Sequence, residues 1–344
     1  MDSLITTMGI KIASAIQGVL GIAQSAAINY GIAALLVGIA VMIIVTIFDY
    51  LFGWIERKLV AKIHLRHGPT RVGKYGLLQN AADFLKLFAK ENIIPANANR
   101  LLFLGSLPIV AAIFALSAEV LPLTPSFYGV DLTLGLLIVF VLISFVPILI
   151  FIAGWASGNK FASISAQRSV MMLISYEIPL FIVIASVAML AKSFSFISIV
   201  SAQSSLWYVA LMPLGFVVFF IALLAELERP PFDLREADSE LIAGWLTDVG
   251  APLYAIALFI DYTRVFVGSM LIVLLFFGGW NGPYLPPSVW LAIKVLAVAI
   301  FVVIVRATTP RMRLDRILRL GWIWLVPLSI INLLWVFLLA IAVV

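Results

Sequence analysis

Long apolar runs, separated by polar segments, extend along the whole chain. A transmembrane α-helix needs about 20 mainly apolar residues to cross the hydrocarbon core of a bilayer. The runs predict eight spans, at residues 29–53, 101–120, 131–155, 170–191, 206–225, 252–277, 288–305 and 321–343. The pattern therefore predicts an all-α, polytopic membrane protein that forms a single transmembrane helical domain over residues 1–344.

The first residues follow a different pattern. Between residues 4 and 24 the apolar side chains recur at helical intervals, and Gly, Ser and Gln fill the other face. This predicts an interfacial amphipathic helix within residues 1–27, with a first, weakly apolar spanning helix as the alternative. The charged n-region of a signal peptide is missing, because Lys11 is the only basic residue before Arg57.

Four polar segments, at residues 54–100, 156–169, 226–251 and 306–320, join the spans on one side of the membrane. In the first segment, residues 54–65 continue the preceding helix, a His-Gly-Pro sequence at 67–69 ends it, and residues 77–90 are again amphipathic. A turn between helices needs only about five residues. The length of these segments therefore predicts a platform that docks a partner. The alternative is loops whose basic residues only satisfy the positive-inside rule.

Basic residues are concentrated in the same four segments. The first contains Arg57, Lys58, Lys62, Arg66, Arg71, Lys74, Lys86, Lys90 and Arg100, and the last contains Arg306, Arg311, Arg313, Arg316 and Arg319. The intervening loops on the other side contain only Lys192. By the positive-inside rule the basic loops are cytoplasmic, in a multi-pass protein of the cell's inner (plasma) membrane. The rule also explains the net charge of +5, so nucleic-acid binding is not inferred.

Composition limits the chemistry of the chain. It is 64% hydrophobic, has no cysteine and has only two histidines, His64 and His67. Disulfides, iron–sulfur ligation and thiolate metal sites are therefore excluded, and two histidines alone make no haem or zinc site. We expect this chain to bind no cofactor or metal, and any redox group to belong to partner subunits.

Carboxylates are concentrated in residues 225–245, AELERPPFDLREADSELIAGW. This segment holds six of the chain's 17 acidic residues: Glu226, Glu228, Asp233, Glu236, Asp238 and Glu240. Ionisable groups at or near a bilayer are costly, so their presence favours function. The alternative is a solvated loop with ordinary surface acids. This alternative has less weight for Glu226, which ends an apolar run, than for the other five acids.

Four segments carry a resemblance to a known family. They are ERKLVAKIHLRHGPTRVGKYGLLQNAADFLKLFAKE (56–91), GWASGNKFASISAQRSVMMLISYEIP (154–179), AELERPPFDLREADSEL (225–241) and RATTPRMRLDRILRLGW (306–322). In this order they resemble the family of membrane subunits called H, or subunit 1, in NADH–quinone oxidoreductase, respiratory complex I. The same type of subunit occurs in F420H2 dehydrogenases and membrane-bound hydrogenases.

The resemblance implies a subunit that anchors a peripheral redox arm, with its iron–sulfur and 49-kDa-like or hydrogenase-like subunits, to the other membrane-arm subunits. It also implies a chamber for the head group of a quinone, or of a similar lipid-soluble carrier such as methanophenazine. Carboxylates next to such a chamber respond to charge on the head group and couple its reduction to proton translocation. Activity is expected only in the complex.

The resemblance assigns relay positions to Glu177, Glu226 and Asp261. Asp261 departs from the family pattern, in which glutamate is usual, and Arg264 one helical turn later is expected to pair with it. For Glu177 a buried packing carboxylate is the alternative, and for Asp261 a structural ion pair. Lys294, inside the seventh span, is a further candidate for charge handling, with snorkelling as its alternative.

Other polar residues are assigned to the chamber and to docking. Asp49 and Glu56, near the cytoplasmic end of the first helix, are expected to bridge chamber and relay. The chamber candidates are Arg57, Asp49, Glu228, Arg229, Asp233, Glu236 and Glu240. For Arg229, pairing with Glu226 or Glu228 is the alternative. The candidates for partner docking are Arg66, Arg71, Lys74 and Asp83.

Two other functions fit parts of the pattern. A secondary transporter would use the carboxylates as ion sites, but it predicts inverted repeats that the sequence does not show. An anchor and ion-coupling subunit of a membrane-bound hydrogenase-type complex would retain the platform without a quinone site. The sequence FDLREADSEL favours the quinone-type members.

Overall fold

The computed structural model describes residues 26–342, apart from residues 126, 130, 236 and 237. Its principal helices are α2 (Ala26–Ile63), α3 (Gln79–Phe88), α4 (Arg100–Val120), α5 (Gly135–Ser144), α6 (Val146–Ala156), α7 (Lys160–Ala191), α8 (Phe196–Ala202), α9 (Tyr208–Leu211), α10 (Pro213–Glu226), α11 (Asp238–Leu241), α12 (Ala251–Phe276), α13 (Pro287–Thr308), α14 (Leu314–Arg319) and α15 (Val326–Ala342). Short 3-10 turns lie at Lys74–Gly76 and Gly244–Leu246, and a π-helical turn at Leu320–Leu325 joins α14 to α15. The interfacial helix predicted for residues 4–24 lies outside the described residues.

Seven helical stretches in the described part are long and apolar enough to cross a membrane. They are Leu35–Ile63, Arg100–Val120, Gly135–Ala156, Lys160–Ala191, Ala251–Phe276, Pro287–Thr308 and Leu314–Ile341. The prediction of an all-α, polytopic membrane protein is confirmed. The fifth predicted span differs, because Met212 separates the single turn of α9 from α10, which has 14 residues and begins at Pro213. Proline has no N–H to donate, and the first turn of a helix is where this N–H is not needed.

Two polar segments are shorter than the sequence predicted, since helices continue beyond the apolar runs. Asn159 caps α7, its Oδ1 accepting a hydrogen bond from the Phe161 N–H at 2.9 Å, so α7 starts at Lys160 rather than near residue 170. Likewise α13 extends to Thr308 and α14 begins at Leu314. The amphipathic helix predicted for residues 77–90 is confirmed as α3.

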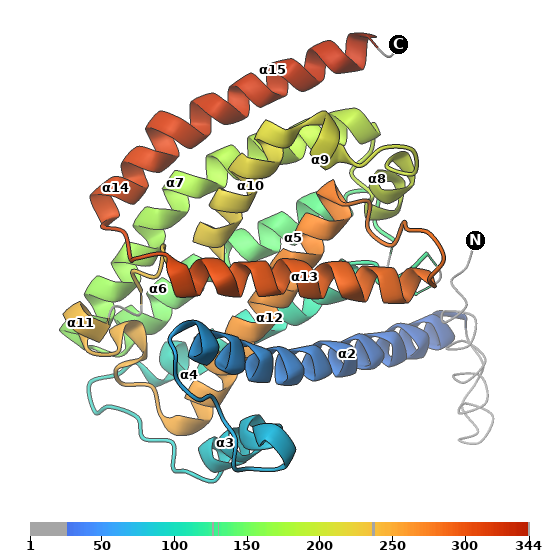
Figure 1. Cartoon of the computed structure of the whole chain (residues 1–344). Coiled ribbons are helices and arrows are strands. Elements are labelled where there is room, and N and C mark those ends of the chain that lie inside the picture. Colours follow the sequence, from blue (N-terminus) through green and yellow to red (C-terminus); the bar gives the residue numbers. More distant parts are fainter. Residues whose placement is uncertain (1–25, 126, 130, 236–237, 343–344) are drawn as a thin grey trace.

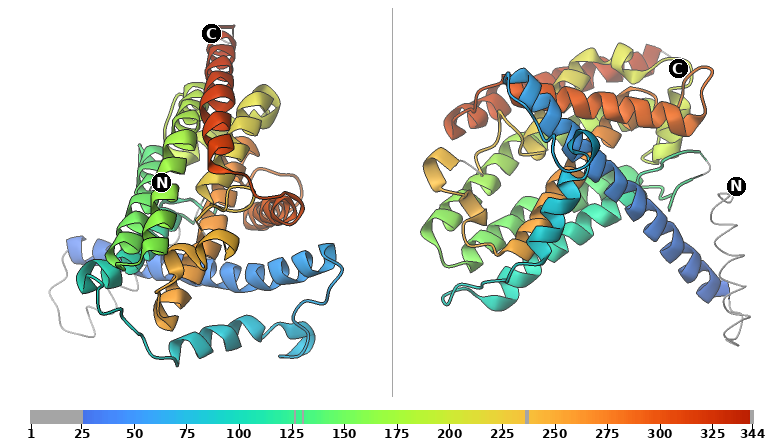
Figure 2. Two further views of the ribbon diagram at one scale, coloured as in Figure 1. Left: turned by 90° about the vertical axis from the view of Figure 1, so that its left-hand side faces the viewer. Right: turned by 60° about the horizontal axis from the view of Figure 1, so that its bottom comes forward.

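Figure 1 shows α7, α10 and α15 side by side, with α2 and α13 crossing the other side of the bundle and α12 between them. The most apolar stretch of α12 is 78% buried, whereas that of α2 is only 28% buried. α3 packs against α2 and α12 (Figure 2). The centre of the molecule is therefore the neighbourhood of α12, and α2 is much less covered by other helices.

Small residues allow the helices to approach closely. A Cβ added at Gly154 on α6 would lie 2.6 Å from the Cβ of Ala166 on α7, and one at Gly215 on α10 would lie 2.7 Å from the Asn332 side chain on α15. Between membrane helices, association depends on such close packing because lipid is as apolar as the helices themselves. These contacts hold the helices that position the polar residues described next.

Candidate functional site

The acidic segment begins where α10 ends. Glu226 is the last residue of α10, Glu228 follows with a φ of 50°, and both side chains are buried. Glu228 Oε2 pairs with Arg235 Nη1 at 2.5 Å and with Arg264 of α12, while its Oε1 accepts a hydrogen bond from Ser169 of α7 at 2.9 Å. Three separate parts of the chain thus converge on one carboxylate.

The charge of Glu228 is held by its two guanidinium partners. Burial alone would raise the pKa of this carboxyl group, but Arg235 and Arg264 hold its pKa below the usual value. Glu228 is therefore ionised at neutral pH. The expected ion pair between Asp261 and Arg264 is wrong, because Arg264 reaches across to Glu228 instead of along its own helix.

A second buried carboxylate, Glu56 of α2, also has two basic partners. Arg229 Nη1 lies 3.0 Å from Glu56 Oε1, and Arg306 of α13 binds the same oxygen. The other oxygen, Oε2, is buried without a hydrogen-bond partner among the described residues. The alternative for Arg229 was a pair with Glu226 or Glu228; its ion pair is instead with Glu56, 173 residues earlier in the chain.

Asp261 of α12 joins the two clusters. Arg235 Nη2 lies 3.4 Å from its Oδ1, and Arg229 Nη2 donates a hydrogen bond to its backbone carbonyl at 3.3 Å. The Asp261 side chain is 24% exposed, so it is less enclosed than the carboxylates on either side. Ion pairs, together with one hydrogen bond to the Asp261 backbone carbonyl, therefore connect Glu56 with Glu228.

Glu226 lies at the far end of this series. It interacts electrostatically with Arg264, Glu228 and Glu177, and Tyr176 of α7 lies beside it. Glu177 is half-buried on α7. The structure thus brings together four of the five residues assigned to the relay from the sequence, namely Glu56, Asp261, Glu226 and Glu177.

Lys294 is the fifth, and it lies apart from the others. Its Nζ donates hydrogen bonds to the carbonyls of Phe277, Gly279 and Asn281, at 2.7, 2.9 and 2.7 Å. Phe277 follows the last residue of α12, about 20 Å along the helix axis from Arg264 at 1.5 Å per residue. In this position Lys294 caps the C-terminal end of α12, where a cation is favourable.

A cavity of about 360 Å³ lies between α2, α3 and α12. Its apolar walls are Ala81, Phe84, Leu85, Leu258 and Phe259, and its polar lining is Thr46, Asp49, Tyr50, Arg57, Asn80, Asp83 and Tyr262. Asp49 is 5% exposed and accepts a hydrogen bond of 2.6 Å from Thr263 Oγ1, while its Oδ1 is buried without a partner among the described residues. A cavity with apolar walls and polar groups that orient a ligand is typical of small-molecule sites.

Arg57 and Asp83 form an ion pair in the wall of this cavity. Arg57 Nη1 lies 2.6 Å from Asp83 Oδ2, and Gln79 donates to Asp83 Oδ1 at 2.9 Å. Partial burial raises the pKa of Asp83, but the hydrogen bonds from Arg57 and Gln79 outweigh it and hold the pKa below the usual value. Asp83, assigned to docking from the sequence, therefore faces the cavity and its partner is intramolecular.

A second, more polar cavity of about 390 Å³ adjoins the first. It is lined by Glu56, Arg57, Val60, Ala61, Arg66, His67, Gly68, Pro69, Tyr262 and Arg306. Arg57 and Tyr262 belong to both cavities. These two residues thus link the lining of the apolar cavity with that of the cavity that contains Glu56, the first member of the carboxylate series.

The remaining chamber candidates lie further from the cavities. Asp233 pairs with Arg311 at 3.0 Å, and Glu240 pairs with Arg168 at 2.7 Å. The Arg168 guanidinium lowers the pKa of Glu240, whose side chain is 54% exposed. These two pairs tie the acidic segment to neighbouring loops and helices, and Glu236 lies outside the described residues.

Three docking candidates are exposed. Arg66, Arg71 and Lys74 lie on the turns between α2 and α3, where Leu65 and Tyr75 are also exposed. The side chains are therefore accessible for contact with another molecule.

Several site residues are not evident from the sequence. The charge pattern marks Arg306 only as a basic loop residue, and Tyr262, Thr263 and Ser169 carry no signal of their own. Tyr262 and Thr263 directly follow Asp261, so a search for polar neighbours within α12 would find them. Ser169 and Arg306 reach partners 59 and 250 residues away, which no local pattern indicates.

In the part of the chain that the structure describes, no group of three or more His, Asp or Glu side chains is arranged to hold a metal ion. Three of the site's carboxylates, Glu56, Asp83 and Glu228, are instead paired with guanidinium groups. The arrangement can hold and move charge next to an apolar cavity.

Comparison with known proteins gives consistent matches. The family model for NADH dehydrogenase matches residues 35–337. The chain is 39% identical over 311 residues to the second NADH-quinone oxidoreductase H subunit of Syntrophobacter fumaroxidans, covering 88% of this chain and 93% of the relative. It is 42% identical over 284 residues to the corresponding NADH-quinone oxidoreductase subunit of Dehalococcoides mccartyi, covering 82% and 80%. It is 40% identical over 301 residues to the F(420)H(2) dehydrogenase H subunit of Methanosarcina mazei, covering 82% and 86%.

Proposed function

Because the chain belongs to the NADH dehydrogenase family, with membrane subunits of two kinds of oxidoreductase among its relatives, we propose that it receives a quinone or similar lipid-soluble carrier and couples its reduction to proton translocation. The cavity between α2, α3 and α12 is the binding space for the carrier. Electrons come from iron–sulfur and 49-kDa-like subunits of a peripheral arm. This multi-pass chain anchors that arm to the other membrane subunits.

The observation that carries the proposal is the position of the apolar cavity beside a continuous series of charged groups. A carrier with an isoprenoid tail needs apolar walls, and its head group needs hydrogen-bond donors. Phe84, Leu85 and Phe259 supply the walls, and Arg57 and Asn80 supply donors at the polar end. A hydrogenase-type anchor without a carrier would not need such a space.

Electrostatics connect the cavity with the carboxylates. Reduction adds negative charge to the head group. At an effective dielectric constant of about 20, two unit charges 4 Å apart interact with an energy of about 4 kcal/mol. Arg57 and the neighbouring Glu56 are the first groups to respond. Glu56, held by Arg229 and Arg306, passes the change on through these two ion pairs.

From Glu56 the response passes along groups already in contact. Arg229 bridges Glu56 and the backbone of Asp261, Arg235 bridges Asp261 and Glu228, and Glu226 and Glu177 follow. In this path Glu228 is a fixed negative charge, since its two guanidinium partners keep it ionised. Glu226 and Glu177 are the groups that exchange protons.

The relatives indicate which step of the complex's reaction this subunit serves. Identity is comparable for relatives named after NADH–quinone and after F420H2 oxidoreductases. A subunit shared by both kinds serves a step common to them, which is not the oxidation of the donor. The exposed Arg66, Arg71 and Lys74 are the proposed contacts with the peripheral arm, on the cytoplasmic side.

The test is to fill the cavity. Ala81 lines the cavity, whereas the adjacent Ala82 is exposed on α3, so the two positions form a matched pair. In the purified intact complex, Ala81→Trp should lower carrier reduction about tenfold or more, while electron transfer from the donor to a hydrophilic artificial acceptor stays unchanged. Ala82→Trp should leave both activities near wild type. Normal carrier reduction in Ala81→Trp would show that the carrier binds elsewhere.

A further inference from the structure

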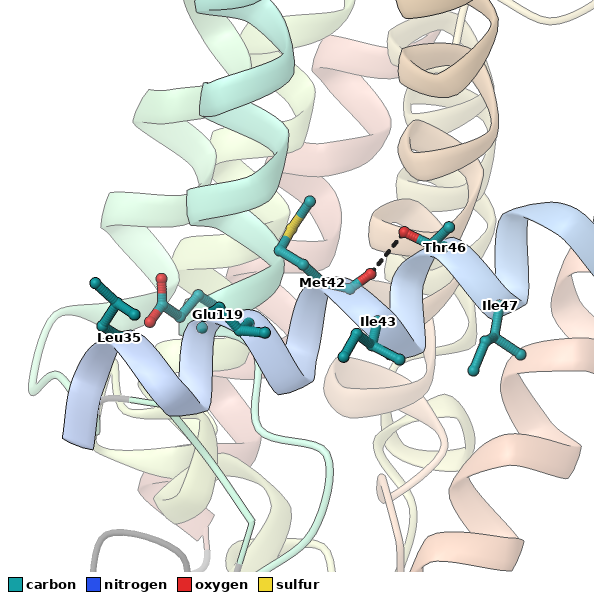
Figure 3. Close-up of a pocket in the computed structure, with 8 residues that line it drawn as sticks. Leu35, Met42, Ile43, Thr46, Ile47 and Glu119 are labelled. Atoms are coloured by element: carbon teal, nitrogen blue, oxygen red, sulfur yellow. Dashed lines mark hydrogen bonds between the residues drawn. The ribbon is translucent and has the colours of Figure 1, made fainter. Parts of the chain in front are cut away.

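Most polar side chains that line the cavity between α2, α3 and α12 already have hydrogen-bond partners within the protein. Thr46 donates from its hydroxyl to the Met42 carbonyl of the same helix at 2.8 Å (Figure 3). Tyr50 donates from its hydroxyl to the Leu77 carbonyl at 2.7 Å, and Asn80 Nδ2 donates to the Tyr50 carbonyl at 2.9 Å. These hydrogen bonds hold the cavity wall together.

Asp49 differs from the other polar residues of the lining. Its Oδ2 accepts the 2.6 Å hydrogen bond from Thr263 of α12, but its Oδ1 is buried and has no partner among the residues that the structure describes. Asp49 is only 5% exposed, and no basic side chain in the described part of the chain pairs with it. Buried polar atoms in proteins nearly always have a hydrogen-bond partner. An unbonded one in a residue that lines a binding cavity therefore points to a partner from outside the chain.

The surroundings of Asp49 favour the neutral carboxylic acid. A charged carboxylate at membrane depth is costly without a counter-charge, and protonation removes that cost. Thr263 donates to Oδ2, so Oδ2 is the carbonyl oxygen of the acid and the hydroxyl hydrogen is on Oδ1. Oδ1 is then a hydrogen-bond donor for which the described residues supply no acceptor.

Oxidised lipid-soluble carriers present acceptors that fit this donor. A quinone has a carbonyl oxygen on each of two opposite sides of its ring, and a phenazine has a ring nitrogen in each corresponding position. Arg57, a donor for the head group in the proposed function, follows Asp49 by eight residues on α2, about 12 Å along the helix axis at 1.5 Å per residue. Both residues line the cavity, which thus has donors at two separate points.

We propose that Asp49 donates a hydrogen bond from Oδ1 to the head group of the oxidised carrier, on the side opposite to Arg57, and so positions it in the cavity. Thr263 orients the acid for this contact through its hydrogen bond to Oδ2. The inference rests on the proposed function and deepens it, because it assigns a second polar contact of the head group.

Two substitutions at Asp49 test the contact in the purified intact complex. The carrier is a short-tailed naphthoquinone or phenazine, whichever the wild-type complex reduces. Asp49→Leu removes the donor and should raise the KM for the carrier about three- to tenfold with little change in kcat. Asp49→Asn places an amide N–H where the acid has its O–H, and should therefore retain a KM near that of wild type.

Asp131 provides the control. It also accepts a hydrogen bond from a hydroxyl, that of Ser195 at 2.9 Å, but it does not line the cavity. Asp131→Leu should leave the KM unchanged. An unchanged KM in Asp49→Leu, a fall in kcat at constant KM, or the same rise in KM in the Leu and Asn variants of Asp49 would each overturn the proposal.

Infrared difference spectroscopy gives a second measurement, which does not require the Asp49→Leu complex to assemble. Binding of the oxidised carrier to the wild-type complex should shift the carbonyl band of a protonated carboxylic acid, and Asp49→Asn should lack this shift. A shift that is absent in wild type, or that persists in Asp49→Asn, would overturn the contact.

The Ala81→Trp variant separates this inference from the proposed function. Normal carrier reduction in Ala81→Trp would reject the cavity as the binding space, and the role of Asp49 with it. Loss of carrier reduction in Ala81→Trp together with a wild-type KM in Asp49→Leu would reject only the role of Asp49.

Discussion

At the scale of single residues, Glu228 shows why a buried carboxylate need not be a proton carrier. Its side chain is 2% exposed and forms ion pairs with both Arg235 and Arg264. Removing one member of a buried ionic cluster leaves the others uncompensated, and this costs more than the cluster contributes as a whole. Glu228 is thus a structural anchor for the carboxylates on either side.

Replacing Glu228 with Gln should therefore act on stability. We expect the free energy of unfolding to fall by about 3 kcal/mol or more, because the buried guanidinium groups of Arg235 and Arg264 lose the carboxylate that they share. Thermal unfolding of the purified complex measures the change. The control is Glu240→Gln, which breaks an ion pair with a 54% exposed carboxylate and should cost at most about 1 kcal/mol. Equal shifts in the two variants would contradict the anchor role.

The pH dependence of that effect has a definite sign. In the folded protein the pKa of Glu228 is held below its value in the unfolded chain, which is about 4.3. Its contribution to stability is therefore complete above the unfolded pKa and is lost as pH falls through the lower folded pKa. Between about pH 6 and pH 9 the difference in stability between wild type and Glu228→Gln should stay constant. A difference that changes across neutral pH would mean that Glu228 titrates there.

At the scale of elements, the segment between α10 and α12 is held by ionic contacts to several parts of the chain. Arg229 reaches α2, Arg235 reaches α12, Asp233 reaches Arg311, and Glu240 reaches α7. The described part of this loop is thus anchored at four points, which fix the position of Asp233 and Glu240 relative to neighbouring elements.

The helices can be predicted from the sequence, because each apolar run is a local pattern. These ionic contacts cannot be predicted in this way, because they join residues that are far apart in the sequence. The sequence pattern misses the first turns of α7 because residues 160–169 are polar, and the helix continues past the apolar run that marks its membrane part. Arg229 and Glu56 are 173 residues apart, so spacing gives no reason to pair them. Asp261 and Arg264 have ideal helical spacing, but a buried carboxylate on another segment is the stronger partner for Arg264.

The far end of α12 provides an element-scale prediction. Lys294 of α13 donates hydrogen bonds to three backbone carbonyls in the turn after α12. Because Lys294→Met removes all three, it should destabilise the complex by about 2–4 kcal/mol. Limited proteolysis in the turn at residues 278–286 should become faster as well. The control is Lys192→Met, an exposed residue after α7, which should change neither. If Lys294→Met instead abolished proton pumping with normal stability, Lys294 would belong to the charge path.

At the scale of the whole molecule, the cavity and the last carboxylates lie in different helices joined by one polar path. The cavity is formed by α2, α3 and α12, while Glu226 and Glu177 belong to α10 and α7. Helix packing brings them together around α12. In the proposed function, a change in charge at the carrier acts through these contacts on the carboxylates of α10 and α7.

Glu226 is the residue at which this coupling can be tested. It ends α10, is buried, and interacts with Glu228, Arg264 and Glu177, so Glu226→Gln removes the exchangeable charge with little change in shape. In proteoliposomes of the intact complex, both carrier reduction and proton pumping should fall about tenfold or more while the complex remains assembled. Glu91→Gln, at an exposed carboxylate between α3 and α4, is the matched control and should retain both activities. Unchanged reduction and pumping in Glu226→Gln would remove Glu226 from the relay, and the acidic segment would then be better explained as a docking surface for the peripheral arm.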